Sequence, residues 1–162
     1  MCRTAGVGPR TVAGTYSRSM SLLLLFNQGP VYESLWRSAL EHQGQGRYQE
    51  CVIFAQMAAE VASDSCLNRL VGRAEPPALR AWLESQIDSN ANLARPSVRK
   101  LFNALSGQEL EGEPWWTAYV ENNRLRNDVA HRGKHALEAE ATRGLQAVRD
   151  LINYLEGHDA VA

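Results

Sequence analysis

The segment LRNDVAHRGKH, residues 125–135, concentrates side chains that could act on a phosphodiester. Arg126 supplies a permanent charge and planar donors suited to phosphate oxygens. His131 can serve as a general acid or base near neutral pH. RNA contains its own nucleophile, the 2′-hydroxyl, so a protein need only move protons and stabilise charge on phosphorus. These residue types therefore suit phosphodiester cleavage without a metal ion.

A helix expected from Trp115 to about His131 positions these side chains, and Gly133 is expected to end it. At about 100° per residue, its apolar core stripe consists of Trp115, Ala118, Asn122, Leu125 and Val129. A second face, flanked by Arg126 and His131, consists of Trp116, Val120, Asn123, Asn127 and Ala130. The C-terminal end of a helix favours a cation, which supports the protonated form of His131. Small and polar residues bordered by Arg and His suit a site or a close protein contact.

The same region has a local excess of positive charge that the net charge of the chain does not show. The formal net charge is −1, so no global basic field draws in nucleic acid. Any contact with RNA or DNA therefore needs a local patch. Such a patch is expected around the motif from Arg124, Arg132, Lys134 and His135.

A structural interpretation of the motif stays open, because the helix dipole alone favours Arg and His near a helix C-terminus. In that interpretation Arg126 pairs with an acid such as Asp128. Glu60, beside an alanine-rich helix face, is interpreted as a buried, paired acid, with a functional role as the alternative. The remaining histidines are expected at the surface: His42, His135 and His158.

The rest of the chain predicts an all-α fold, because helical periodicity recurs and no segment alternates as a strand does. The expected helices are 31–42, 47–71, a short one that starts at 75–77, 97–105, 115–131 and 137–155. They predict an antiparallel bundle of four main helices with a small helical insertion at 75–105. Residues 1–19 are expected to be a poorly ordered tail before a single domain at 20–158. The core stripe of the last helix is expected to begin at Leu137 and end at Leu155.

The composition is that of a soluble protein without a membrane span or a cysteine-based metal site. Hydrophobic residues make up 44% and charged residues 22%, as in soluble globular proteins. The longest apolar run, Leu22 to Phe26, is far shorter than the ~20 residues that cross a bilayer. Cys2, Cys51 and Cys66 form neither a CxxC motif nor a metal-ligand pair. We therefore expect a cytoplasmic protein with no membrane association, metal site or cofactor.

The stretch LRNDVAHRG, followed by an amphipathic helix to Leu155, resembles the signature of the HEPN superfamily (higher eukaryotes and prokaryotes nucleotide-binding). The motif of that family is Arg-x(4–6)-His, commonly with a polar residue directly after the Arg. Arg126, Asn127 and His131 fit it as Arg-Asn-x3-His. The helix YQECVIFAQMAAEVASDSCLNRLV also resembles an early helix of these domains, so the resemblance covers about residues 31–157.

The resemblance implies a four-helix bundle of HEPN type that dimerises, so that two Arg/His motifs face each other in a composite cleft. Many members are metal-independent ribonucleases, often toxins or antiviral defence factors. Others bind nucleotides or have lost activity. The short motif does not account for the insertion at 75–105 or for the N-terminal tail.

The leading hypothesis is a homodimeric endoribonuclease of this type that acts on RNA by 2′-OH attack. In it His131 is the general acid or base, Arg126 stabilises the transition state, and Asn127 orients the phosphate or Arg126. Four further residues are expected to bind the substrate: Asn123, Arg124, Arg132 and Lys134. The alternative is a non-catalytic HEPN-like module that binds a nucleotide or a partner protein, such as an antitoxin or a defence factor.

Overall fold

A computed structural model describes residues 29–86 and 91–157 of the chain. These two ranges are all-α, as the sequence predicts, and contain no strand. The helices are α2 (Val31–Gly44), α3 (Tyr48–Gly72), α4 (Pro77–Gln86), α5 (Pro96–Ser106), α6 (Trp116–Arg132) and α7 (Glu138–Gly157), with a 3-10 turn, η1 (Leu110–Gly112), before α6. Four features of the sequence lie outside the described residues: the predicted tail at 1–19, Cys2, the apolar run from Leu22 to Phe26, and His158.

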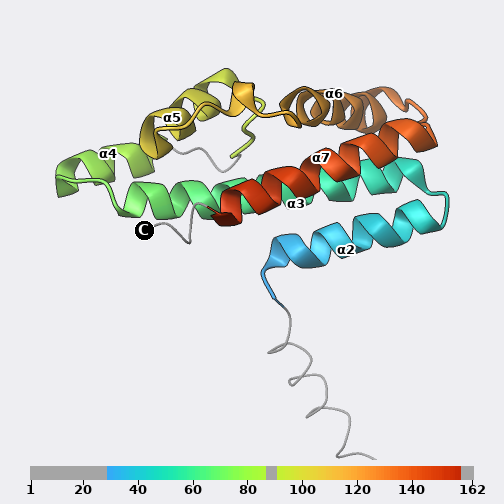
Figure 1. The fold of residues 1–162 in the computed structure, drawn as a ribbon, viewed down its shortest axis with the longest axis horizontal. Coiled ribbons are helices and arrows are strands. Elements are labelled where there is room, and N and C mark those ends of the chain that lie inside the picture. Colours follow the sequence, from blue (N-terminus) through green and yellow to red (C-terminus); the bar gives the residue numbers. More distant parts are fainter. Residues whose placement is uncertain (1–28, 87–90, 158–162) are drawn as a thin grey trace, which may run out of the picture.

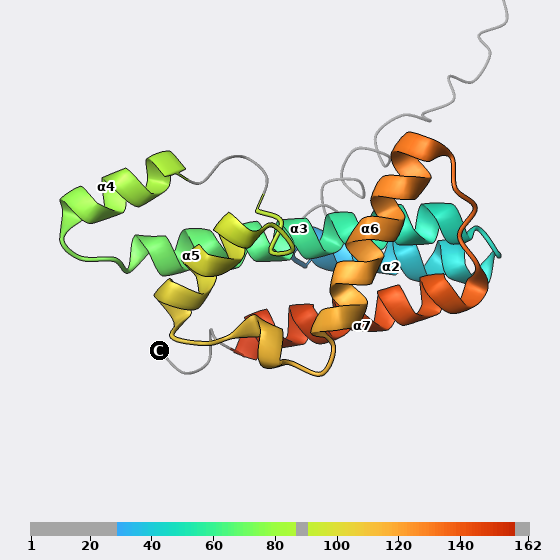
Figure 2. The same ribbon diagram turned by 90° about the horizontal axis from the view of Figure 1, so that it is seen from above.

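Helix α3 is the centre of the fold. Helix α2 packs on one side of it, α6 lies on the other, and α7 runs beside it (Figure 1). Seen from above, α6 crosses over α3 rather than lying along it (Figure 2). The helices α4 and α5, which lie within the predicted insertion at 75–105, both contact α3.

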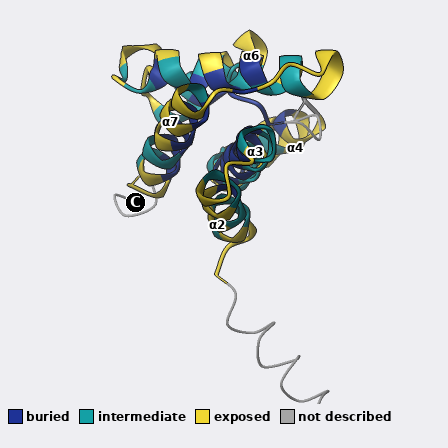
Figure 3. Cartoon of the chain, turned by 90° about the vertical axis from the view of Figure 1, so that its right-hand side faces the viewer, coloured by how far each residue is buried: buried dark blue, intermediate teal, exposed yellow. Residues whose placement is uncertain are grey.

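Small side chains let the neighbours of α3 approach closely. Ala55, Ala58, Ala59 and Ala62 are at most 4% exposed and share one face of the helix, within about 100° of one another. Figure 3 shows the buried residues gathered where α3, α6 and α7 face one another. Leu67, about 120° around the helix from Ala55, is buried as well, so α3 is covered beyond its alanine face.

The contact between α6 and α7 depends on a glycine. A Cβ atom added to Gly144 of α7 would lie 2.1 Å from Oδ1 of Asn122 on α6. Asn122 is 2% exposed, and its Nδ2 donates a hydrogen bond to Oε1 of Gln56 on α3 (3.2 Å). Only a residue without a side chain leaves room for Asn122 at this crossing.

Several helix boundaries differ from the prediction. Helix α2 continues to Gly44, and the chain turns at Gly46, whose φ is 72°. The predicted connection at 106–114 contains the turn η1. The prediction that Leu137 begins the core stripe is wrong, because Leu137 is 65% exposed and precedes the first turn of α7. The predicted stop at Gly133 is confirmed by its φ of 64°.

No helix among the described residues has the length and apolar character needed to span a membrane.

Candidate functional site

The motif lies in the last turns of α6, and its arginine is not paired with an acid. Arg126 is half-buried, and its Nη1 donates to Oδ1 of the adjacent Asn127 (3.0 Å). Asp128, the acid that the structural interpretation assigned to Arg126, instead pairs with Arg132 (2.8 Å). Within the described ranges no carboxylate forms an ion pair with Arg126. Its positive charge therefore remains available to an anion.

His131 occupies the exposed end of the same helix. Its side chain and that of Asn127 are both exposed. Beyond them Gly133 takes a left-handed conformation, and the backbone N–H of Lys134 donates to the carbonyl of Asp128 (3.2 Å). This turn ends the helix at Arg132, one residue after His131, and leaves the imidazole in contact with solvent.

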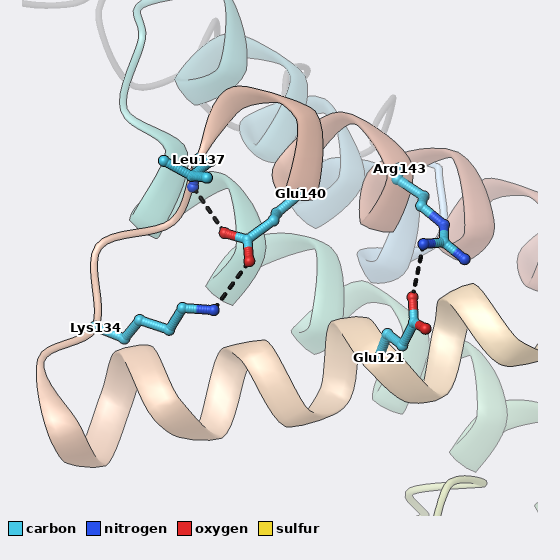
Figure 4. Close-up of polar contacts among 5 residues, drawn as sticks. All are labelled: Glu121, Lys134, Leu137, Glu140 and Arg143. Carbon is cyan, nitrogen blue, oxygen red and sulfur yellow. Dashed lines mark hydrogen bonds and ion pairs between the residues drawn. The ribbon is translucent and has the colours of Figure 1, made fainter.

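The basic patch expected around the motif is weaker than the sequence suggests. Arg132 is engaged by Asp128, and Nζ of Lys134 lies 2.9 Å from Oε1 of Glu140. Figure 4 shows Lys134 reaching from the end of α6 to the first turn of α7. Arg124 is exposed and has no ion pair among the residues that the structure describes. Arg124 and Arg126 are therefore the uncompensated cations of this helix end.

The candidates do not all share one face of α6. Asn123 faces the loop before α5, where its Oδ1 accepts a hydrogen bond from Nδ2 of Asn92 (2.7 Å). Arg124 and Lys134 instead line a cavity of about 300 Å³ on the α7 side of the helix. A larger groove of about 780 Å³ lies further along α6 and α7, where Trp115 and Arg143 help to line it. The structure thus places the predicted substrate-binding residues on two sides of α6.

The buried arc of α6 is wider than the predicted stripe. Asn122 and Leu125 are buried as expected, but Trp115, Ala118 and Val129 are only half-buried. Trp116, assigned to the second face, is 8% exposed, and Tyr119 is completely buried. The reason is that α6 packs on both α3 and α7, so two sides of the helix are covered.

A network of buried side-chain amides links α6 to α3 and to the loop before α5. Nε2 of Gln56 donates to Oε1 of Glu60 (3.3 Å), and Nδ2 of Asn92 donates to the same oxygen (3.2 Å). Asn122 joins through Gln56 and Asn123 through Asn92. The interpretation of Glu60 as a buried, paired acid holds only in part, because Glu60 is half-buried and its partners are amides rather than cations.

Sequence reasoning missed Gln56, Asn92 and Asn122 as polar partners near the motif. A hydrogen-bond partner for Gln56 could have been predicted, because a polar residue among the alanines of a buried helix requires one. Asn122 was assigned to the core but without a partner. Asn92 gave no signal, since the loop that carries it has no periodicity from which its burial could be read.

Tyr119 belongs to this network as a donor. Burial raises the pKa of its hydroxyl far above the ordinary value, so the group stays protonated. The hydroxyl donates to Oδ1 of Asn92 (3.4 Å). Tyr119 therefore supports Asn92 and is not suited to proton transfer near neutral pH.

The other chemically active side chains do not form a second site. Cys51 and Cys66 are buried, and burial raises the pKa of the Cys51 thiol to about 11, so it is a poor nucleophile. His135 is exposed and contacts Nε2 of Gln49 through its Nδ1 (2.7 Å). His42 is half-buried against Phe54, so its predicted surface position holds only in part. Among the residues the structure describes, no three His, Cys, Asp or Glu side chains are grouped to hold a metal ion.

Glu140 stabilises the junction between the motif and α7. Its Oε2 accepts a hydrogen bond from the backbone N–H of Leu137 (2.9 Å), and its Oε1 contacts Lys134 (Figure 4). The N–H of Leu137, followed by the ammonium group of Lys134, lowers the pKa of the Glu140 carboxyl. A lowered pKa in the folded state means that this stabilisation is present above the unfolded pKa and is lost as the pH falls through the folded one.

We therefore expect Glu140→Ala to reduce the free energy of unfolding by about 1 kcal/mol at pH 7, as loss of a helix cap does. The difference from wild type should shrink as the pH falls from the ordinary carboxyl pKa through the lowered pKa of Glu140. Glu140→Gln, which keeps an acceptor for Leu137 but lacks the charge, should lie between the two. Urea unfolding at a series of pH values measures this, and a difference that does not change with pH would contradict the role of the charge.

No family model, curated protein or solved structure matches this chain.

Proposed function

We propose that this protein is a metal-independent endoribonuclease of HEPN type that cleaves RNA by attack of the 2′-hydroxyl. One observation carries the proposal: Arg126 has no carboxylate partner among the described residues, and the nearest acid in the sequence, Asp128, pairs with Arg132. An arginine with a purely structural role would be expected to pair with an acid one turn away on α6 or on a neighbouring helix. An uncompensated guanidinium suits a phosphate oxygen, and the exposed His131 lies five residues further along the same helix.

In this mechanism His131 accepts the proton of the 2′-hydroxyl or donates one to the leaving 5′-oxygen. Arg126 stabilises the charge that develops on the phosphorus oxygens. The contact between Arg126 and Asn127 (3.0 Å) fixes the guanidinium on the helix surface, which fits a positioning role for Asn127. Arg124 is free to bind the RNA backbone, whereas Arg132 and Lys134 must leave their acids to do so.

In this proposal the protein acts as a toxin or an antiviral defence factor. Its active form is a homodimer with a composite site. Arg126 and His131 are five residues apart, so they point about 140° apart around the helix. Side chains so oriented do not converge easily on one phosphate within a single protomer. A second copy, with its own α6 end facing the first, would supply the missing side of the cleft.

The Arg126 assignment predicts a loss of catalysis rather than of folding. Arg126→Ala should reduce kcat by about 10²–10³-fold, the usual effect of removing a donor to the developing charge. Arg126→Lys should recover part of it, because lysine keeps the charge but loses the planar donors. The measurement is cleavage of a labelled single-stranded RNA in excess EDTA. The control is Arg37→Ala, at an exposed position on α2.

If Arg126→Ala cleaves RNA as fast as wild type, the assignment fails. If wild type binds RNA or a nucleotide at this face without turnover, the protein is the non-catalytic binding module instead.

A further inference from the structure

The loop before α5 carries a buried amide whose orientation is fixed by its partners. Asn92 is 8% exposed. Its Oδ1 accepts hydrogen bonds from the backbone N–H of Ala94 (2.9 Å) and from the hydroxyl of Tyr119 (3.4 Å). Its Nδ2 donates to Oε1 of Glu60 (3.2 Å) and to Oδ1 of Asn123 (2.7 Å). If the Asn92 amide were flipped by 180°, its nitrogen would face the N–H of Ala94 and its oxygen would face the carboxylate of Glu60. Only the observed orientation therefore satisfies its hydrogen bonds.

This orientation determines that of Asn123. Because Oδ1 of Asn123 accepts from Asn92, its Nδ2 lies on the other side of the amide and retains its two N–H donors. Among the described residues, nothing accepts a hydrogen bond from this nitrogen. Asn123 is half-buried, so the amide borders solvent without being freely mobile. Arg126 and Asn127 follow it by one helical turn, on adjoining positions of α6.

We propose that Asn92 is a positioning residue that holds the Asn123 amide ready to donate to a phosphate oxygen of bound RNA. The inference rests on the proposed function for its substrate. A phosphodiester fits because its oxygens only accept hydrogen bonds, and the site offers amide donors beside the guanidinium of Arg126. The segment 75–105, which the family motif leaves unexplained, thereby contributes to the site through its loop.

Glu60 keeps Asn92 in the donating orientation. Its Oε1 accepts from both Asn92 and Gln56, so the carboxylate anchors the loop to α3. A neutral or absent side chain at position 60 would weaken the preference of Asn92 for this orientation. A change at Glu60 would affect RNA binding only through Asn92 and Asn123. Glu60 and Asn92 therefore act by positioning Asn123 and do not contact the RNA themselves.

Two substitutions test the inference. Asn123→Asp keeps the oxygen that accepts from Asn92 but replaces the free donor with a second, negatively charged oxygen. Asn92→Ala leaves Asn123 intact but removes its support. The controls are Asn153→Asp, the same chemical change at an exposed position of α7, and Val148→Ala, a buried truncation in α7 away from the network.

The probe is fluorescein-labelled 2′-O-methyl hexauridylate, which resembles RNA but lacks the attacking hydroxyl. Fluorescence anisotropy with the full chain should show binding about ten-fold or more weaker for Asn123→Asp, the loss expected for one hydrogen bond to a charged group. Asn92→Ala should raise Kd and, on cleavable RNA, raise KM while kcat stays close to wild type. Both controls should bind as wild type does.

The Asn123 side-chain amide gives a readout that a merely structural role would not move. In ¹⁵N–¹H spectra its signals are assigned by their absence in Asn123→Asp, and they should shift when the probe is added. If wild type cleaves RNA while both variants match it and the signals do not shift, the positioning inference fails and the proposed function stands. If the probe binds and shifts the signals but cleavable RNA is not cut, the catalytic proposal fails and the inference stands. If the probe does not bind but cleavable RNA is cut, the inference fails and the proposed function stands; if the probe does not bind and RNA is not cut, both fail.

Discussion

Replacing His131 with alanine is expected to reduce metal-independent RNA cleavage by about 10²–10⁴-fold, the usual contribution of a positioned general acid or base. His131 is exposed at the end of α6. Its removal should therefore change the free energy of unfolding by no more than about 0.5 kcal/mol. Cleavage of a labelled RNA in EDTA, measured beside urea unfolding, separates lost chemistry from lost structure.

His135 provides the matched control for this prediction. It is also an exposed histidine, only four residues away, but it lies in the connection after α6 and contacts Gln49. His135→Ala should cleave RNA at close to the wild-type rate. Equal losses in the two variants would indicate that the region acts through its general charge, and equal retention would refute the catalytic assignment of His131.

Substituting Gly144 with alanine is expected to destabilise the fold by about 1–3 kcal/mol, in the range of overpacked interiors. The new Cβ would lie 2.1 Å from Oδ1 and 2.7 Å from Cγ of Asn122. Asn122 cannot turn aside without breaking its hydrogen bond to Gln56 (3.2 Å) or moving α6 away from α7. Because α6 carries the motif, the variant should lose activity as well as stability.

Gly157→Ala is the control for Gly144→Ala, since a Cβ at Gly157, the last residue of α7, would meet no atom within 4 Å. Urea unfolding should show little or no loss for it. A double variant that also carries Asn122→Ala should be less destabilised than the sum of the two single changes, because the clash disappears with the asparagine side chain. Strict additivity would contradict the proposed contact.

The helices could be predicted because their signals are local. Apolar periodicity outlined α3, α6 and α7, and Gly133 marked the stop that the structure places at φ 64°. Leu137 was misplaced because periodicity continues past the end of a helix, whereas burial depends on what packs there. The crossing of α6 over α3 was not foreseen, since the angle between two helices depends on tertiary contacts such as that of Asn122 with Gln56.

The candidate site could be predicted in part, for the same reason. Residue type and spacing located Arg126, Asn127 and His131, because the chemistry of each follows from its side chain alone. The pairing of Asp128 with Arg132, four residues apart on one helix, could have been read from the spacing but was missed. The pairing of Lys134 with Glu140 could not, because it depends on how the chain turns between α6 and α7. Asn92 meets Asn123 across 31 positions of sequence, and only the fold brings such residues together.

The most direct test of the central claim is the chemistry of the product ends that wild-type protein forms in EDTA. End-group analysis on single-stranded RNA should find a 2′,3′-cyclic phosphate and a 5′-hydroxyl, because the neighbouring 2′-oxygen is the nucleophile. The same RNA with a 2′-deoxy residue at the cleavage position should be resistant there. Cleavage that requires added metal, products with a 3′-hydroxyl, or no cleavage of RNA at all would contradict the proposal.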